Sequence, residues 1–173
     1  VGITAVEIGK LMGAEVIAAA SSENKLAAAK RAGADHLINY SEGNIREKIK
    51  NIVGSSGIDV LYDPVGGELF EPCLRSLAWG GRALVIGFAS GTIPKLPTNL
   101  TLVKGCSVVG VFWGAFRIKE TEEDNKNFEI LFKWFKEKKL SPLVSQKFSL
   151  ENAKEALLTL SNRKAIGKVI LTP

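Results

Sequence analysis

The chain has 173 residues, 46% of them hydrophobic, which suits one globular domain with a sizeable core. Its formal net charge is +5, but the basic residues are spread along the chain rather than clustered, which argues against a nucleic-acid-binding module. Two cysteines without paired spacing and a single histidine argue against a disulfide scaffold and a metal site. No stretch approaches the roughly 20 apolar residues of a membrane span.

Residues 1–22 predict a helix that leads into a buried strand. Apolar residues recur at helical spacing from Ile3 to Met12, and Gly13 stands where helices commonly end. Residues 15–20 are apolar without alternation, as in a strand covered on both faces by helices. This is the second half of a βαβ nucleotide-binding unit, whose opening strand and glycine-rich turn are not in the sequence. We therefore expect a fragment of a larger nucleotide-binding protein.

The rest of the chain alternates helices and strands. The sequence predicts a helix at 24–32, a strand at 35–40, a helix at 45–53, a strand at 58–63, a helix at 68–77 and a strand at 82–87. After a loop at 92–98 it predicts a helix at 99–104, a strand at 107–113, a helix at 120–139, an extended segment at 143–145, a helix at 150–161 and a strand at 167–171.

This order predicts an α/β fold with a Rossmann-type, doubly wound parallel sheet in a three-layer α/β/α arrangement, lacking its first strand. Ligands of such sheets bind outside the carboxyl ends of the strands.

The end of the strand at 15–20 indicates which dinucleotide is preferred. Proteins that bind NAD present an acid about 20 residues beyond the glycine-rich turn, where it accepts hydrogen bonds from the ribose 2′-hydroxyl. Ser21 and Ser22 occupy that position and Lys25 follows one turn later, which favours the 2′-phosphate of NADP because an acid would repel it. A helix-capping serine and a solvated surface lysine explain these residues equally well when they are taken alone.

Several motifs in register extend over the whole chain. They are Val-Gly-Ile-Thr-Ala-Val-Glu-Ile-Gly at 1–9, Gly-Ala-Asp-His-Leu-Ile-Asn-Tyr at 33–40, Asp-Pro-Val-Gly-Gly at 63–67, Gly-Gly-Arg at 80–82, Val-Ile-Gly-Phe-Ala-Ser-Gly at 85–91 and Gly-Lys-Val-Ile-Leu at 167–171. Together they resemble the medium-chain dehydrogenase/reductase superfamily, and within it the zinc-independent quinone oxidoreductases of the zeta-crystallin group.

The resemblance implies a two-domain enzyme that uses NADPH to reduce quinones or α,β-unsaturated carbonyls. Residues 1–173 would be its NADP(H)-binding domain, with 140–173 as a C-terminal return segment. The GroES-like N-terminal domain, the first strand and most of the glycine-rich turn would lie outside this chain. The isolated chain is therefore expected to have little or no activity.

The resemblance also implies the cofactor contacts, which would be Val1, Gly2, Ser21, Ser22, Lys25, Tyr40, Val65, Gly66, Gly87, Phe88, Ala89, Phe112, Trp113 and Arg163. Val1 and Gly2 would approach the pyrophosphate at a helix N-terminus. Lys25, Tyr40 and Arg163 would hold the 2′-phosphate, and the other residues from 65 to 113, at the ends of three strands, would line the adenosine and nicotinamide portions of the groove. Ring packing of Tyr40, a helix-dipole contact of Arg163 and ordinary glycine turns are the alternatives.

Three other residues have weaker claims to a functional role. His36 stands at the start of a strand, opposite the ligand end, so a structural role is expected. Asp63 before Pro64 is explained equally well by a cofactor contact and by turn formation. Lys168 is explained at least as well by a place on a sheet rim as by a cofactor contact. No catalytic residue is assigned, because the family's substrate-polarising groups come mainly from the missing domain. No metal ligand is assigned either, because the chain has a single histidine and two cysteines without paired spacing.

The strand at 107–112 is expected to lie at a sheet edge, and the resemblance implies a homodimer paired through it. No nucleic-acid or membrane partner is expected. The alternatives are a non-catalytic NADP-sensing or structural protein on the same fold, and an enoyl-thioester reductase of the same superfamily. A cytoplasmic location is the default, and a mitochondrial one stays open because the true N-terminus is not present.

Overall fold

The computed structural model describes residues 1–162 and 164–173. Its internal contacts divide the chain into two compact units, one formed by Val1–Leu37 and Ile130–Pro173, the other by Ile38–Glu129. Each unit is described by itself.

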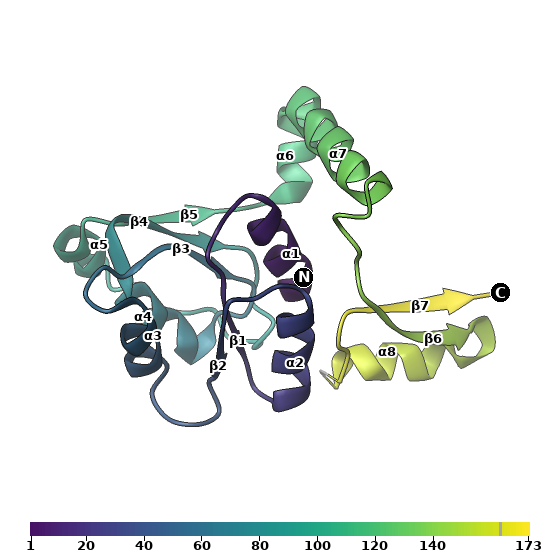
Figure 1. Ribbon diagram of the computed structural model, residues 1–173, viewed down its shortest axis with the longest axis horizontal. Helices are drawn as coiled ribbons and strands as arrows, with labels where there is room; N and C mark the ends of the chain where they lie inside the picture. Colours follow the sequence, from purple (N-terminus) through teal and green to yellow (C-terminus); the bar gives the residue numbers. More distant parts are fainter. Residues whose placement is uncertain (163) are drawn as a thin grey trace. The chain divides into compact units, whose positions relative to one another are not determined.

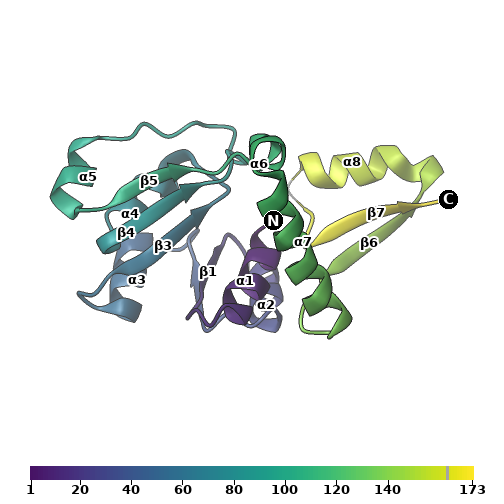
Figure 2. The same ribbon diagram turned by 90° about the horizontal axis from the view of Figure 1, so that it is seen from above.

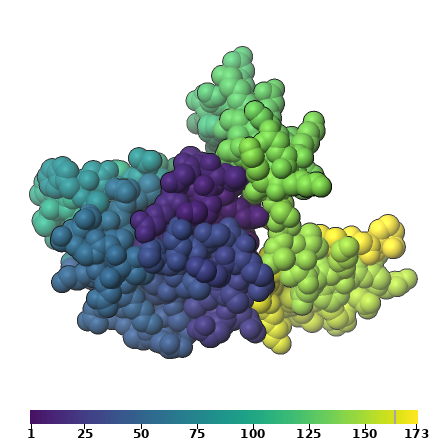
Figure 3. Space-filling model, viewed as in Figure 1, coloured from purple at the N-terminus to yellow at the C-terminus, as the bar shows by residue number. Residues whose placement is uncertain are grey.

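The N-terminal part of the first unit contains α1 (Gly2–Leu11), β1 (Ile17–Ala20) and α2 (Glu23–Arg31), and β1 pairs with β2 (His36–Asn39). The two helices lie side by side (Figures 1 and 2), and their residues form adjoining purple and dark-blue surfaces in Figure 3. The buried core consists of Val6, Ala18, Ala29 and Ala34. Small side chains at three of these positions let the helices and the strand approach closely.

The C-terminal part of the first unit is a strand-helix-strand element. β6 (Val144–Ser149) leads through η2 (Leu150–Asn152) into α8 (Ala153–Ser161), and β7 (Lys168–Thr172) follows. β6 and β7 pair in parallel, and α8 packs against both. This order was predicted, but β6 is longer than the extended segment expected at 143–145.

The second unit is built on three parallel strands in the order β3-β4-β5, which are β3 (Ile58–Asp63), β4 (Leu77–Val85) and β5 (Ser107–Gly110). Its other elements are α3 (Ile45–Val53), η1 (Gly67–Leu69), α4 (Phe70–Leu74), α5 (Asn99–Lys104), α6 (Trp113–Lys119) and the first turns of α7 (Thr121–Lys136). The buried core is Phe70, Leu74, Leu77, Ala83 and Leu100. α4 packs against both β3 and β4, and α5 packs against β4.

The parallel α/β class was predicted, but the hydrogen-bonded strands fall into three sheets rather than one. β1 ends the first sheet and β3 ends the second. β5 ends the second sheet at its other edge, so the prediction of an edge strand there is confirmed.

The helix predicted at 68–77 extends too far toward its C-terminus. α4 ends at Leu74, and Leu77, the first residue of β4, already pairs with Ile58 of β3. Leu74 and Leu77 are both fully buried and three residues apart, a spacing that also fits a helix face. The Gly-Gly pair at 80–81 lies inside β4, where residues 78–81 bulge opposite Asp59 alone instead of forming a turn before the strand.

The strand predicted at 107–113 is too long. β5 ends at Gly110, Phe112 is the N-cap residue of α6, and Trp113 is its first residue. The β-branched and aromatic residues of this stretch favour a strand by local preference, whereas the chain turns into a helix after Gly110. Helix α6 was not predicted.

Candidate functional site

The predicted cofactor contacts are divided between the two units. Val1, Gly2, Ser21, Ser22 and Lys25 belong to the first unit, and Tyr40, Val65, Gly66, Gly87, Phe88, Ala89, Phe112 and Trp113 belong to the second. Arg163 lies outside the described residues.

The start of α1 fits an anionic ligand. Val1 is the N-cap residue, and a Cβ on Gly2 would meet no atom within 4 Å, so the first turn is open. The first N–H groups of a helix have no partner inside it, and the helix dipole favours negative charge there. Lys168 lies within electrostatic range of Val1 at this helix start. An open first turn with a nearby lysine suits a pyrophosphate.

The end of β1 departs in one respect from a simple helix cap. Ser22 is the N-cap residue of α2, and its carbonyl oxygen accepts hydrogen bonds from Lys25 N and Leu26 N. Its side chain, however, makes no capping hydrogen bond to the helix. The capping role expected as the alternative for this serine is therefore not realised by its hydroxyl, and the half-buried Lys25 lies in the first turn of the same helix.

The segment after β2 is held by polar contacts on either side of the half-buried Tyr40. Ser41 donates from both its backbone N and its Oγ to Asn39 Oδ1, at 3.1 and 2.6 Å. Lys48 of α3 donates from Nζ to the Asn39 carbonyl oxygen at 2.8 Å. These bonds fix the backbone that presents Tyr40 at the end of the strand.

The loops after β3 and β4 are joined to each other at the carboxyl ends of these strands. The Val65 carbonyl accepts from Ser90 N at 2.9 Å, and the Pro64 carbonyl accepts from Ala89 N at 3.1 Å. Gly66 has φ of +66°, and a Cβ there would lie 3.0 Å from the Phe88 ring, so only glycine fits without a shift. The structure thus brings four predicted contacts together, Val65, Gly66, Phe88 and Ala89.

Asp63 forms a turn. It is 9% exposed, and its Oδ1 accepts hydrogen bonds from Val65 N at 2.8 Å and Gly66 N at 3.0 Å. Of the two roles left open for this residue, turn formation is the one with observed contacts. Asp63 also adds to the effect of burial in raising the pKa of Cys73 to about 12, so that cysteine is an unreactive thiol near neutral pH.

Two aromatic residues follow the carboxyl end of β5. Val111 N donates to the Val85 carbonyl at 3.0 Å, which holds the chain beside β4 before it turns into α6. The next two residues, Phe112 and Trp113, are 78% and 53% exposed. The Trp113 Nε1 donates to Asp124 Oδ1 at 3.0 Å. Sequence reasoning missed this partner, because it placed Trp113 in a strand and left α6 out.

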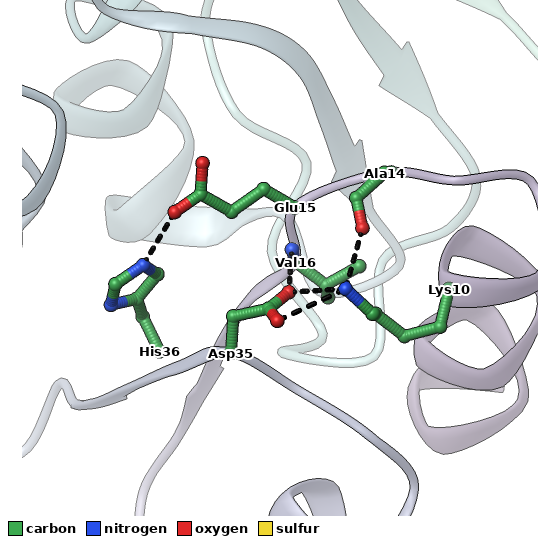
Figure 4. A network of polar contacts seen from close by, with 6 residues as sticks. All are labelled: Lys10, Ala14, Glu15, Val16, Asp35 and His36. Atoms are coloured by element: carbon green, nitrogen blue, oxygen red, sulfur yellow. Dashed lines mark hydrogen bonds and ion pairs between the residues drawn. The ribbon is translucent and has the colours of Figure 1, made fainter.

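A polar network lies where β1 and β2 begin (Figure 4). Lys10 Nζ donates to both oxygens of Asp35, at 2.7 and 3.0 Å, and Asp35 Oδ2 also accepts from Val16 N at 2.7 Å. His36 Nε2 lies 2.7 Å from Glu15 Oε1. These residues precede or open the strands, whereas the ligand end is opposite, which supports the structural role expected of His36.

A cavity of about 670 Å³ borders the loops of the second unit and was not predicted. Its lining comes from three separate segments, so no local motif signals it. The charged lining residues are Arg46, Glu68, Glu71, Arg75 and Lys95. Arg75 donates from Nη2 and Nε to Glu71 Oε1 at 2.6 and 2.9 Å. The mixture of acids and bases favours no single ligand charge.

In the part of the chain that the structure describes, no group of three His, Cys, Asp or Glu side chains is placed to hold a metal ion. None of the helices in residues 1–162 and 164–173 has the length and apolar character of a membrane span.

Comparison with known proteins identifies the family. Residues 1–131 match the family model described as zinc-binding dehydrogenase. The chain is 37% identical over 172 residues to quinone oxidoreductase-like protein 2 of Bos taurus, covering 99% of this chain and 49% of the relative. It therefore spans about half the length of the curated relatives it matches.

Solved structures agree with this match. The chain superimposes on Escherichia coli quinone oxidoreductase complexed with NADPH, with a TM-score of 0.85 and 29% identity, covering 99% of this chain and 53% of that one. It also superimposes on an NAD-dependent alcohol dehydrogenase, with a TM-score of 0.82 and 32% identity, covering 99% and 47%. The chain belongs to the zinc-binding dehydrogenase family, in the quinone oxidoreductase-like group of the medium-chain dehydrogenase/reductase superfamily.

Proposed function

We propose that the whole protein uses NADPH to reduce quinones or α,β-unsaturated carbonyls, and that this chain holds the cofactor. The observation that carries the proposal is the joined carboxyl ends of β3 and β4, where Val65, Gly66, Phe88 and Ala89 meet. The similarity to a quinone oxidoreductase complexed with NADPH supports the choice of cofactor and substrate class. Because the chain spans about half the length of its relatives, the activity belongs to the whole protein, and the 173-residue chain alone should give no turnover.

In this proposal the first unit binds the charged part of the cofactor. Val1, Gly2 and Lys168 accommodate the pyrophosphate, because an open helix start and a lysine both favour an anion. Ser22 and Lys25 bind the 2′-phosphate, and the resemblance adds Ser21 and Arg163 from this unit and Tyr40 from the second unit. A lysine, hydroxyl groups and an arginine suit a dianionic phosphate.

The second unit orients the rest of the cofactor. Val65, Gly66, Gly87, Phe88 and Ala89 form a glycine-containing wall that a flat ring can approach closely. When bound, the nicotinamide supplies the hydride, and the residues of this chain fix its position and exclude water.

The activity is tested with the whole protein and a panel of quinones, enones and enoyl thioesters, following NADPH absorbance. We expect NADPH oxidation with quinones or simple enones. Turnover only with enoyl thioesters would assign a different substrate class. NADPH binding without any turnover would favour a sensing or structural role.

Lys25→Ala tests the contact to the 2′-phosphate. The loss of a charge-assisted contact should weaken NADPH binding by about tenfold and NADH binding by less than about twofold, because NADH has no 2′-phosphate. Lys30→Ala, in the last turn of the same helix, is the matched control and should change neither affinity. Equal losses for both cofactors with Lys25→Ala would remove this assignment.

We also propose that the whole protein is a homodimer paired through β5. β5 ends its sheet, and Val109 and Val111 are 40% and 41% exposed. An open apolar edge strand is a template for pairing with its copy. Light scattering should give twice the monomer mass, and Val109→Lys should shift it to the monomer. A monomeric unsubstituted protein would contradict the proposal.

A further inference from the structure

A buried aspartate joins α6 to α7 within the second unit, and the proposed function does not yet use it. The chain turns between the two helices at Glu120 alone, and the helices lie beside each other (Figures 1 and 2). Thr121 Oγ1 donates to the Arg117 carbonyl at 2.9 Å, which satisfies an acceptor at the end of α6. This sharp turn brings the first turn of α7 against the first turn of α6.

Asp124 is the centre of the contacts between the two helices. It is 6% exposed, and Oδ1 accepts from Trp113 Nε1 at 3.0 Å while Oδ2 lies 3.4 Å from Arg117 Nε. The Arg117 guanidinium also lies over the Trp113 ring, 5.0 Å from its centroid, and the Phe128 ring lies 6.5 Å away at a tilt of 53°. The Trp113 indole is therefore held by a hydrogen bond, a cation–π contact and an aromatic neighbour.

The ring of the preceding residue lies close to the start of α6. The Phe112 ring lies against Gly114 of α6, where a Cβ would be only 3.2 Å from Phe112 Cε2. Phe112 and Trp113 nevertheless remain 78% and 53% exposed. Both follow the carboxyl end of β5, the end at which parallel α/β sheets bind ligands. An exposed aromatic ring that is already held in place, as Trp113 is, loses little conformational entropy when a flat molecule stacks on it.

We infer that Asp124 and Arg117 are positioning residues that hold Trp113, beside the exposed Phe112, as an aromatic wall selective for planar, ring-conjugated substrates over small aliphatic enones. This inference rests on the proposed function. Asp124 and Arg117 act through the indole and do not touch the substrate.

The test uses the whole protein at saturating NADPH, with 1,4-naphthoquinone and 2-cyclohexenone as substrates. Asp124→Ala removes both contacts of the carboxylate, whereas Asp124→Asn keeps an oxygen that accepts from the indole. Glu123→Gln is the matched control, because Glu123 is the adjacent α7 residue and its side chain is 57% exposed and pairs only with Lys126 among the described ion pairs.

We expect Asp124→Ala to raise the KM for naphthoquinone about five- to tenfold, the range of one lost aromatic contact. The KM for cyclohexenone and the kcat values should stay within about twofold, and Asp124→Asn should recover most of the naphthoquinone KM. Equal losses for both substrates, or an unchanged naphthoquinone KM, would overturn the inference. If Asp124→Ala does not fold, Trp113→Phe, which removes only the indole and its donor, should raise the same KM.

A spectroscopic measurement separates this inference from the proposed function. With Trp79 and Trp134 replaced by Phe, Trp113 is the only tryptophan of this chain, and in the full-length protein any other tryptophans are replaced likewise. Asp124→Ala should then increase acrylamide quenching of its fluorescence, and Glu123→Gln should not. Unchanged quenching would overturn the positioning role even if the enzyme is active. If the unsubstituted protein reduces neither substrate, the proposed function and the selectivity both fail, while quenching still decides whether Asp124 holds Trp113.

Discussion

Asp35 in the first unit and Asp124 in the second each face one cation and one N–H donor, but their surroundings differ. The Asp35 side chain is 35% exposed and has contacts of 2.7 Å to Lys10 and to Val16 N. The Asp124 side chain is 8% exposed and has longer contacts, 3.0 Å to Trp113 and 3.4 Å to Arg117. Water can replace the partners of an exposed carboxylate, whereas the indole N–H facing a buried one loses its only described acceptor. The buried Asp124 network should therefore contribute more to the free energy of unfolding than the exposed Asp35 network, although its contacts are longer.

The largest effect should come from Asp124→Ala. It removes the buried carboxylate that accepts from Trp113 Nε1 and faces Arg117, which should lower the free energy of unfolding by about 1–3 kcal/mol. Urea denaturation of the whole protein measures this loss. Glu123→Gln should stay within about 0.5 kcal/mol of the unsubstituted protein, as a surface substitution does. If Asp124→Ala lowers the free energy of unfolding no more than this control does, burial does not decide which network contributes more to stability.

Asp63 is also buried, at 9% exposed, but its described side-chain partners are backbone N–H groups. Asp63→Ala should lower the free energy of unfolding by about 1–2 kcal/mol, as the loss of a capping side chain does. Asp63→Asn keeps an acceptor and should lose less. Equal losses for both variants in urea denaturation would mean that the carboxylate charge, rather than its accepted hydrogen bonds, holds the turn.

The Asp35 network should have the smallest effect and a defined pH dependence. The hydrogen bond from Lys10, followed by that from Val16 N, lowers the pKa of Asp35 below its ordinary value. A lowered pKa in the folded state stabilises above the unfolded value of about 3.9, and this stabilisation is lost as the pH falls through the folded value. The stability difference between the unsubstituted protein and Asp35→Asn should be present near neutral pH, shrink in about 1 M salt and vanish in strong acid. A difference that grows on acidification would contradict this.

Most of the fold was predictable where periodicity and end signals agree. Strand Ile58–Asp63 and helix Asn99–Lys104 have the predicted bounds, and helix Ile45–Val53 begins after Asn44, whose side chain accepts from Arg46 N. Prediction failed where one pattern fits two structures. The spacing of Leu74 and Leu77 suits a helix face, but only their tertiary partners place Leu77 in a strand.

The sequence indicated where the residues of the candidate site lie, but not which side chains they contact. Glycines and turn residues at strand ends pointed to Val65, Gly66 and Phe88, which the structure brings together. The partners of Trp113 were not predictable, because Asp124 stands eleven residues away on a helix whose angle to α6 is set by packing. A carboxylate in the charged first turn of α7 has the sequence signature of a solvated helix start, and only burial distinguishes it from its neighbours.

Calorimetric titration of the whole protein with NADPH and with NADH, under the same conditions, directly tests the binding of NADP(H) by this chain. The similarity to an NAD-dependent alcohol dehydrogenase makes NADH the informative competitor. We predict that NADPH binds at least about tenfold more tightly, because NADH lacks the 2′-phosphate that the proposed contact from Lys25 would bind. Equal affinity, or tighter binding of NADH, would contradict the account.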